Sequence, residues 1–448
     1  MSMNRRDFLK TSALATLATG AATRTRVGLA GPGAASDDVL LFVYLRGAMD
    51  GLSFVAPIAG ELRVQYEQAR SATRIPASGA NAALPLANSG GLWGLHPRAS
   101  GLHTLYQDGK LAIVHAVGMT QQPVTRSHFD AQAFMEYGLG GLSGSEGWLT
   151  RHLRTGGLPA SIPIPSLCVG AITSTSLLAS TETITMASGG AFRLDTGDWA
   201  WRASDVSGNT GFVDLLPALW QGASELERKG RQALDSLALI RPIDFNAYVP
   251  ANGAVYDGGS LGSQMKMLAT LIKREDLGLR IATVDYGGWD THNGQGNPTQ
   301  GWDYFGNLVE EFSGALTAFC TDLDGSHLGR VNIIVMSEFG RRVLENDAGG
   351  TDHGYGNIAL VLGGAVNGGQ TYGSFPGLAT EQLFERADVG VTTDYRHILA
   401  EAVNRRLRNP HLPAVFPGYT DYAPLGIFQG TDLPPADYEM IFASGFEA

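Results

Sequence analysis

The sequence predicts an α/β protein, built as a three-layer α/β/α sandwich around a mainly parallel β-sheet. Short segments that are almost continuously apolar, as central strands covered on both faces are, alternate with segments of helical periodicity. Strands that alternate with helices favour a parallel sheet. Polar motifs follow several of the apolar segments, and sites in such sheets form beyond the carboxyl ends of the strands.

The expected elements occupy most of a single domain over residues 38–418. Strands of the main sheet are expected over residues 39–45, 111–117, 279–287, 331–337 and 357–364. Helices are expected over residues 97–108, 129–137, 212–239, 260–273, 304–320 and 395–407. The region 155–210 has short alternating runs rich in Ser, Thr and Gly, which predict a small β-rich insertion or a cap over the site. Residues 419–448 are expected to form a peripheral tail.

The N-terminus has the features of a twin-arginine export signal. Arg5 and Arg6 are followed by a short, mildly apolar segment and then by small residues that offer cleavage sites between about Ala30 and Ser36. The apolar segment is too short to span a bilayer about 30 Å thick. Residues 1–35 are therefore expected to be a signal peptide recognised by the twin-arginine translocase. The mature protein is expected in the periplasm or outside the cell, without an integral membrane segment.

Composition and charge argue against several classes of function. Hydrophobic residues make up 44% of the chain and charged residues only 17%, enough for a large buried core. The net charge of −11 argues against nucleic acid or an anionic membrane as the main partner. The two cysteines, Cys168 and Cys320, exclude a cysteine-built zinc or iron–sulfur site. They could form one disulfide or remain as two buried thiols.

Carboxylates and imidazoles recur beside the predicted strand ends. They occur in Gly-Gly-Trp-Asp-Thr-His after the strand at 279–287, in Ser-Glu-Phe-Gly-Arg-Arg after the strand at 331–337, and in Thr-Asp-His before the strand at 357–364. Such side chains suit a divalent ion such as Zn²⁺, Mn²⁺, Mg²⁺ or Ca²⁺. Singly, each residue also has a structural interpretation, such as capping a turn or pairing with a nearby arginine. Jointly they predict a metal site with the candidate ligands Asp50, Asp290, His292, Glu338, Asp352 and His353.

The segment 125–130 has two interpretations. Ser127 precedes a predicted helix, and a hydroxyl beside a metal is a potential nucleophile because coordination lowers its pKa. With Asp130 three residues later, Ser127 is equally placed to cap the helix, and this interpretation is favoured.

Two arginines are candidates for binding the transferred group of a substrate, since guanidinium groups make bidentate contacts with anions. They are Arg46, after the first strand, and Arg341, after Glu338. Arg46 could instead form a turn-stabilising pair with Asp50.

A literal Gly-x-Ser-x-Gly motif at 258–262 suggests a serine hydrolase, which is the weakest alternative. A nucleophile elbow needs a strand-to-helix turn, and no apolar strand precedes this motif. We expect Ser260 to cap the helix at 260–273.

Six blocks of the sequence occur in the order RGAMDGL, SHFDAQ, GWLTRHL, GGWDTH, SEFGRR and GTDHG. In these blocks the chain resembles the domain of unknown function (DUF) 1501 family over nearly all of residues 38–418. That family is similar in turn to the alkaline phosphatase and sulfatase superfamily. The resemblance implies an alkaline phosphatase-like core, with metal ligands at strand ends and a Ser, Thr or modified Cys nucleophile. It places Ser127 or Thr125 at the nucleophile and, among the metal ligands, Asp50, Asp290, His292, Glu338 and His353.

The chain also departs from the superfamily pattern. Glu338 and Phe339 stand where the superfamily has an Asp-His pair, so one imidazole is missing. No cysteine occupies the nucleophile segment, which argues against a formylglycine sulfatase. The resemblance implies an exported, metal-dependent hydrolase of phosphate or sulfate esters, with a small-molecule or polymer substrate. The alternative is a non-catalytic envelope binding or assembly protein with a degenerate site.

Overall fold

The structure is a computed structural model that describes residues 36–120, 124–141, 143–159, 161–190, 192 and 212–438. The chain divides into two units, Met1–Ala34 and Ala35–Ala448, and only the second contains described residues. The expected signal peptide therefore lies outside the described residues. Within the described ranges, no helix has both the length and the apolar character needed to cross a membrane.

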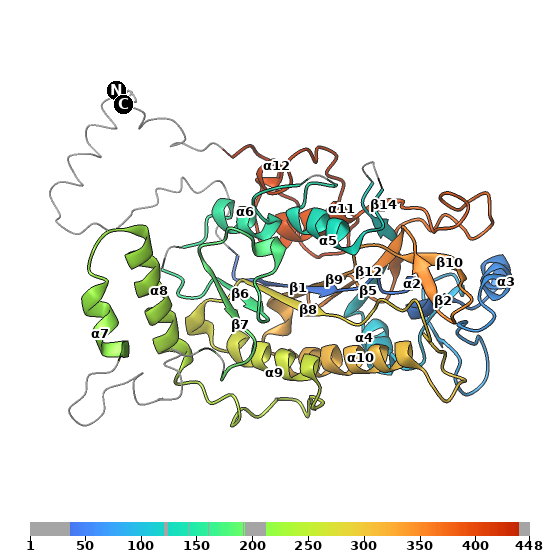
Figure 1. Ribbon diagram of the computed structural model, residues 1–448, viewed down its shortest axis with the longest axis horizontal. Coiled ribbons are helices and arrows are strands. Elements are labelled where there is room, and N and C mark those ends of the chain that lie inside the picture. Colours follow the sequence, from blue (N-terminus) through green and yellow to red (C-terminus); the bar gives the residue numbers. More distant parts are fainter. Residues whose placement is uncertain are drawn as a thin grey trace. The chain divides into compact units, whose positions relative to one another are not determined.

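A nine-stranded, mainly parallel sheet forms the centre of the fold (Figure 1). Its strands lie in the order β13 (Thr371–Tyr372), β5 (Leu111–Gly118), β12 (Asn357–Gly363), β9 (Val331–Met336), β1 (Val39–Leu45), β8 (Ile281–Tyr286), β6 (Ser166–Val169) and β7 (Thr183–Met186), and β14 (Thr393–Asp394) also pairs with β5. Strand β12 runs antiparallel to both of its neighbours, β5 and β9. The other pairings in this sheet are parallel.

Strand β1 shows how the sheet separates two hydrophobic cores. All seven of its residues are buried. Leu41 and Val43 belong to one core, whereas Leu40 and Phe42 belong to the other. Successive side chains of a strand point to opposite faces, so a strand between two helical layers has to be apolar throughout. The predicted α/β fold class with its mainly parallel sheet is confirmed.

Helices cover both faces of the sheet (Figure 1). One face is covered by α4 (Ser100–Gln107), α9 (Ser260–Ile272) and α10 (Tyr304–Leu323). The other is covered by α5 (His128–Tyr137), α6 (Trp148–Thr155), α11 (Tyr395–Glu401) with a π-helical turn at Ala402–Arg406, and α12 (Leu412–Val415).

The remaining elements are small. A short antiparallel sheet contains β2 (Val55–Pro57), β4 (Trp93–Leu95) and β3 (Leu84–Pro85), near α2 (Gly51–Phe54) and α3 (Gly60–Ala69). A second one pairs β10 (Arg341–Glu345) with β11 (Thr351–His353). Single 3₁₀ turns lie at Thr175–Leu177, Glu275–Leu277 and Leu328–Arg330.

The helix predicted over 212–239 is two helices, α7 (Phe212–Leu219) and α8 (Glu225–Ile240). Ser224 caps α8, because its hydroxyl accepts the backbone N–H of Glu227 while the Glu227 carboxylate accepts the N–H of Ser224. This reciprocal capping box starts a new helix and therefore breaks the predicted one.

The region predicted as a β-rich insertion, 155–210, contributes to the main sheet. Strand β6 pairs in parallel with β8, and β7 pairs in parallel with β6, so both extend the sheet at its edge. Residues 193–211 lie outside the described residues. The described part of the tail packs closely: Phe428 is fully buried, and its N–H donates to the Glu401 carboxylate on α11.

Both cysteines are free and buried. Cys168 lies in the core beneath α5 and α6, and Cys320 lies in the core on the opposite face. The sheet lies between them, so of the two alternatives from the sequence the structure has two buried thiols.

Candidate metal centre

Strand direction gathers the predicted polar residues at one edge of the sheet. Strands β1, β5, β8 and β9 run the same way, so their carboxyl ends share this edge, and the antiparallel β12 begins there. The segments after β5, β8 and β9 and before β12 bring together His128, Asp290, Glu338 and His353.

Three imidazole rings converge on one carboxylate oxygen. Asp290 Oδ1 lies 3.4 Å from His128 Nε2, 3.2 Å from His292 Nε2 and 3.3 Å from His353 Nε2. Ligand atoms around a tetrahedral ion bound at 2.0–2.1 Å are about 3.3 Å apart. The spacing therefore matches a coordination sphere, and His128, Asp290 and His353 form a group that could hold a metal ion. His292 is not part of that group but lies against it, and we call His128, Asp290, His292 and His353 the histidine cluster.

In two of these rings the other nitrogen is held by an acceptor. His128 Nδ1 lies 2.7 Å from Glu338 Oε1, and His353 Nδ1 lies 2.8 Å from the backbone oxygen of Arg126. An Nδ1 that faces an acceptor carries the proton, so the neutral ring presents an unprotonated Nε2 to the cluster. Metal-binding histidines are typically oriented in this way. His128 Nε2 is also buried without a hydrogen-bond partner among the described residues, as a vacant ligand atom would be.

The third ring, His292, follows the same pattern. Its Nδ1 lies 3.0 Å from Asp352 Oδ1, and that oxygen also accepts a hydrogen bond from Asn346. These two hydrogen bonds, from Asn346 and then His292, lower the pKa of Asp352. His292 Nε2 and His353 Nε2 lie 2.9 Å apart, and which ring donates depends on the tautomers. With both Nδ1 atoms protonated, the two Nε2 atoms need a proton or a cation bound to both, so the donor set is compatible with a metal ion.

Asp290 is held as an anion by Arg341. Arg341 Nη2 donates to Asp290 Oδ1 at 2.6 Å, while its other nitrogens donate to the backbone oxygens of Ala48 and Thr351. Burial raises the pKa of Asp290, but the hydrogen bond and charge of Arg341 outweigh it and lower the pKa to about 2. Arg341 is itself wholly buried, so the structure places it behind Asp290 and not where a substrate would contact it.

Glu338 lies one contact behind the histidine cluster. Its Oε1 accepts hydrogen bonds from Gln132 Nε2 at 2.7 Å and from the backbone N–H of Gly47 at 2.9 Å, in addition to His128. Burial raises the pKa of Glu338, and the hydrogen bonds from His128 and Gln132 outweigh this and lower it. The same hydrogen bond raises the pKa of His128. Glu338 and Asp352 therefore orient imidazoles and do not converge with the three Nε2 atoms.

Asp50 lies in a different contact network. Its buried carboxylate pairs with Arg70 at 2.5 Å and accepts hydrogen bonds from Ser53 and Gln295. Burial raises the pKa of Asp50, but the charge of Arg70 outweighs burial and lowers it. Since the carboxylate already has a buried cation, the structure does not bring Asp50 into the histidine cluster.

The Arg46 guanidinium is also occupied by contacts with other side chains of the protein. Its Nη1 pairs with Glu136 at 2.7 Å and its Nη2 with Asp285 at 3.0 Å, and the guanidinium lies 4.1 Å above the Tyr44 ring. The sequence suggested a pair with Asp50, which is wrong.

Ser127 caps α5, the helix in which His128 is the first residue. Its hydroxyl accepts the backbone N–H of Asp130 at 3.4 Å, so the favoured capping interpretation is confirmed. The cap places Ser127 immediately beside a member of the histidine cluster.

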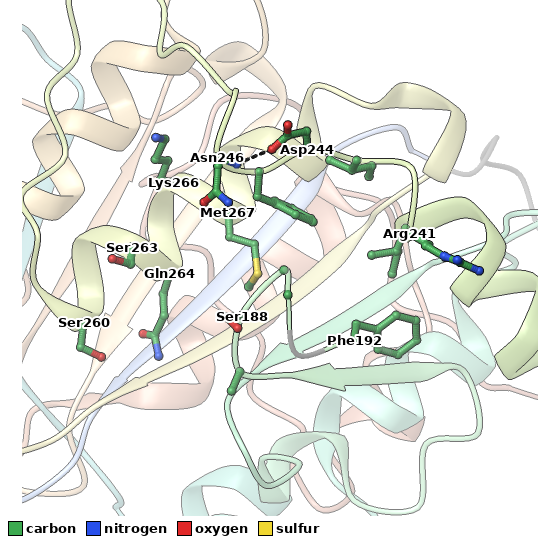
Figure 2. A pocket seen from close by; sticks show the side chains of 16 residues that line it. Ser188, Phe192, Arg241, Asp244, Asn246, Ser260, Ser263, Gln264, Lys266 and Met267 are labelled. Carbon is green, nitrogen blue, oxygen red and sulfur yellow. Dashed lines mark hydrogen bonds between the residues drawn. The ribbon is translucent and has the colours of Figure 1, made fainter. Parts of the chain in front are cut away.

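Ser260 lies at a separate cavity of about 760 Å³ (Figure 2). Helix α9 begins at Ser260 with Gly259 at the capping position and no side-chain cap, so the expectation that Ser260 caps this helix is wrong. The described residues that line the cavity include no histidine, and the Asp244 carboxylate accepts backbone N–H groups of Asn246 and Ala247. The lining residues therefore offer no Ser-His-Asp arrangement.

The sequence interpretation missed His128 and Gln132, which both contact Glu338. Both stand in the block SHFDAQ, at the beginning of helix α5, which follows a central strand. A polar residue in the segment after a central strand is the same signal that pointed to Asp290 and Glu338.

Comparisons with known proteins cover part of the chain. Residues 253–411 match the family described as "Protein of unknown function (DUF1501)". The matched region contains Asp290, His292 and His353. It begins after His128 and therefore does not include that residue. A search of curated proteins gave no match.

Among solved structures, the chain is similar to a protein in the alkaline phosphatase superfamily from Vibrio parahaemolyticus. The two share 11% sequence identity with a TM-score of 0.27, over 73% of this chain and 62% of that one. The match therefore spans about three fifths of the length of that protein.

Proposed function

We propose that this chain is an exported, metal-dependent hydrolase of phosphate or sulfate esters, with the histidine cluster as its metal centre. The observation that carries the proposal is the convergence of three Nε2 atoms on Asp290 Oδ1, each ring being held through Nδ1. Export rests on the N-terminal sequence, and the ester class rests on the sequence blocks that resemble the DUF1501 family.

In this proposal His128, Asp290, His292 and His353 hold one divalent ion. A bound divalent ion acts as a Lewis acid on an ester oxygen. Imidazole with carboxylate suits Zn²⁺ or Mn²⁺, whereas Mg²⁺ and Ca²⁺ prefer oxygen ligands. Arg341 keeps Asp290 ionised, so this ligand stays available at neutral pH.

Ser127 supplies the candidate nucleophile. Its Oγ accepts the N–H of Asp130, and no described residue accepts its own hydroxyl proton. The cap fixes the backbone of Ser127 directly before His128, and this position supports Ser127 as the candidate nucleophile.

A second candidate function is non-catalytic binding or assembly in the cell envelope, with the same metal centre. The observation that favours it is the state of the two predicted substrate arginines. Arg341 is buried against Asp290, and Arg46 is paired with Glu136 and Asp285. Neither guanidinium is left free to bind a transferred phosphoryl or sulfuryl group.

The test is elemental analysis of the natively exported protein beside a His128→Ala/His353→Ala double variant. We expect about one equivalent of a divalent metal in the wild type and a loss of nearly all of it in the variant. Metal-loaded protein is then assayed with aryl phosphates and aryl sulfates. Bound metal without turnover would favour the binding protein, and absence of metal from both proteins would refute the metal centre.

A further inference from the structure

Gln295 lies behind the histidine cluster and joins the two segments that carry most of its residues. Its side chain is fully buried, and its Oε1 accepts hydrogen bonds from Thr291 Oγ1 at 2.9 Å and Thr351 Oγ1 at 3.1 Å. Thr291 stands between Asp290 and His292. Thr351 begins β11, the strand that ends at His353.

Thr291 alternates with two residues of the histidine cluster for a geometric reason. Successive side chains of an extended segment point to opposite sides. Thr291 and Thr351 are buried, whereas Asp290 is about half exposed and His292 about one third exposed. One side of the segment 290–292 therefore faces the candidate metal, and the other faces Gln295. In β11, Thr351 and His353 lie two residues apart, and the buried Thr351 hydroxyl donates to Gln295 directly.

Backbone hydrogen bonds tie the same two segments together. The N–H of Thr351 donates to the backbone oxygen of Thr291 at 3.0 Å, and the N–H of Gln295 donates to that of Gly349 at 2.8 Å. A displacement of one segment is thus passed to the other, and the Gln295 amide lies where the two meet.

The other end of the Gln295 amide is anchored to a buried ion pair. Its Nε2 donates to Asp50 Oδ2 at 2.8 Å and to Ser53 Oγ at 3.0 Å. Arg70 pairs with Asp50 and also donates to the backbone oxygen of Val343 in β10 at 2.8 Å. The Asp50 carboxylate only accepts hydrogen bonds, so it fixes which end of the Gln295 amide faces the threonines.

We propose that Gln295 is a positioning residue for the metal centre. With Asp50 and Arg70 as its anchor, it holds Thr291 and Thr351, and through them the segments that carry Asp290, His292 and His353. The inference rests on the proposed metal centre and gives Asp50 a role at a distance from the ion. Only an amide serves here, because it accepts from two hydroxyls and donates to a carboxylate.

The experiment uses Gln295→Met, which keeps the length of the side chain and removes both functions of the amide. We expect the dissociation constant for Zn²⁺, measured by competition with a chelating dye, to rise about 10- to 100-fold, the usual effect of losing a group behind the ligands. The electronic absorption of the Co²⁺-substituted protein should change as well, because the ligand geometry changes.

Two threonine variants show whether Gln295 acts through its hydroxyl partners. Thr291→Val and Thr351→Val should each weaken Zn²⁺ binding, and neither should weaken it further in the Gln295→Met background. Thr270→Val is the matched control, because this buried hydroxyl on α9 donates to the backbone oxygen of Lys266 and has no link to the centre. It should lower stability without changing the affinity or the Co²⁺ spectrum.

Unchanged Zn²⁺ affinity and an unchanged Co²⁺ spectrum in Gln295→Met would overturn the proposal, even if stability fell. A wild type that binds no metal would instead refute the proposed metal centre. In that case, hydrogen exchange at the Thr351 amide of the metal-free protein still decides about Gln295. We expect faster exchange in Gln295→Met than in Thr270→Val, and equal rates would refute the positioning role.

Discussion

At the scale of single residues, the contacts of His128 orient its ring as the proposed metal ligand requires. Its Nδ1 faces Glu338 at 2.7 Å, and its Nε2 faces Asp290 at 3.4 Å without a hydrogen bond. The ring also stacks on Phe339, which fixes its plane. His96 and His115 also have an Nε2 without a partner among the described residues, but only at His128 does a carboxylate oxygen lie in front of it, which supports the proposed metal centre.

This arrangement predicts the effect of removing the ring. His128→Ala should weaken Zn²⁺ binding more than about 100-fold, and Glu338→Gln, which removes the charge behind the ring, about 10- to 100-fold. Dye competition measures both. His103→Ala is the control, because His103 lies on α4 and contacts the backbone oxygen of Pro85. If His128→Ala bound Zn²⁺ as tightly as this control, His128 would not be a ligand.

At the scale of elements, the beginning of α5 combines a structural and a proposed chemical role. Ser127 caps the helix through the N–H of Asp130, and Gly138 ends it in a left-handed conformation. The cap satisfies a backbone N–H that would otherwise lack a partner. It also sets the orientation of His128, the first helical residue.

Two variants of Ser127 separate these roles. Ser127→Ala should lower the free energy of unfolding by about 1 kcal/mol, whereas Ser127→Asn, which can still cap, should lower it by less than about 0.5 kcal/mol. Both should abolish ester hydrolysis if Ser127 is the nucleophile. Chemical denaturation and assays on aryl phosphate and aryl sulfate measure the two effects. Full activity in Ser127→Asn would exclude the nucleophile role and leave only the cap.

Helix α6 was not predicted from the sequence, because its eight residues are too few for a helical period to stand out. Helix α6 is buried on almost every side, including the polar residues Thr150, Arg151 and His152. Arg151 is accommodated by donating to the backbone oxygens of Val415 and Glu146. The Val415 contact comes from a segment far away in the sequence, so the burial of the polar side of this helix is set by the tertiary structure.

At the scale of the whole molecule, burial of neutral histidines in the cores makes stability depend on pH. Burial lowers the pKa of His96 to about 3, and those of His115 and His152 to about 4, from an ordinary value of 6.5. Between pH 6.5 and 4 the unfolded chain binds protons that the folded chain does not. The stabilisation is therefore complete above pH 6.5 and is lost as the pH falls through this range.

His115→Phe tests this dependence on a ring whose Nε2 lacks a hydrogen-bond partner among the described residues and which packs on Trp93. Each such histidine contributes a slope of up to about 1.4 kcal/mol per pH unit. The variant should therefore lose stability less steeply between pH 6.5 and 4. Denaturation at a series of pH values gives the slope, with His103→Phe as the control. A slope equal to that of the wild type would show that His115 is not responsible.

The main sheet could be predicted from the sequence because its signals are local. The apolar run at β1 appears in the structure with the predicted bounds, and β5, β8, β9 and β12 differ from their predicted segments by at most two residues at an end. A strand covered on both faces must be apolar throughout, whatever its neighbours are. The polar residues at strand ends were found for the same reason, since the order of motif and strand is visible in the chain.

Which of the polar residues are candidate ligands, and which only hold the imidazoles in place, depends on tertiary contacts. His128 is a candidate ligand only because β5 lies beside β12 and brings it to His353, and Asp50 is removed from that role only because Arg70 folds back onto it. Glu338 and Asp352 likewise become supports for imidazoles. A carboxylate has the same chemistry in each of these roles, so the residue type predicts a polar centre. Which of these groups joins the histidine cluster is set by partners that are distant in sequence and adjacent only in the fold.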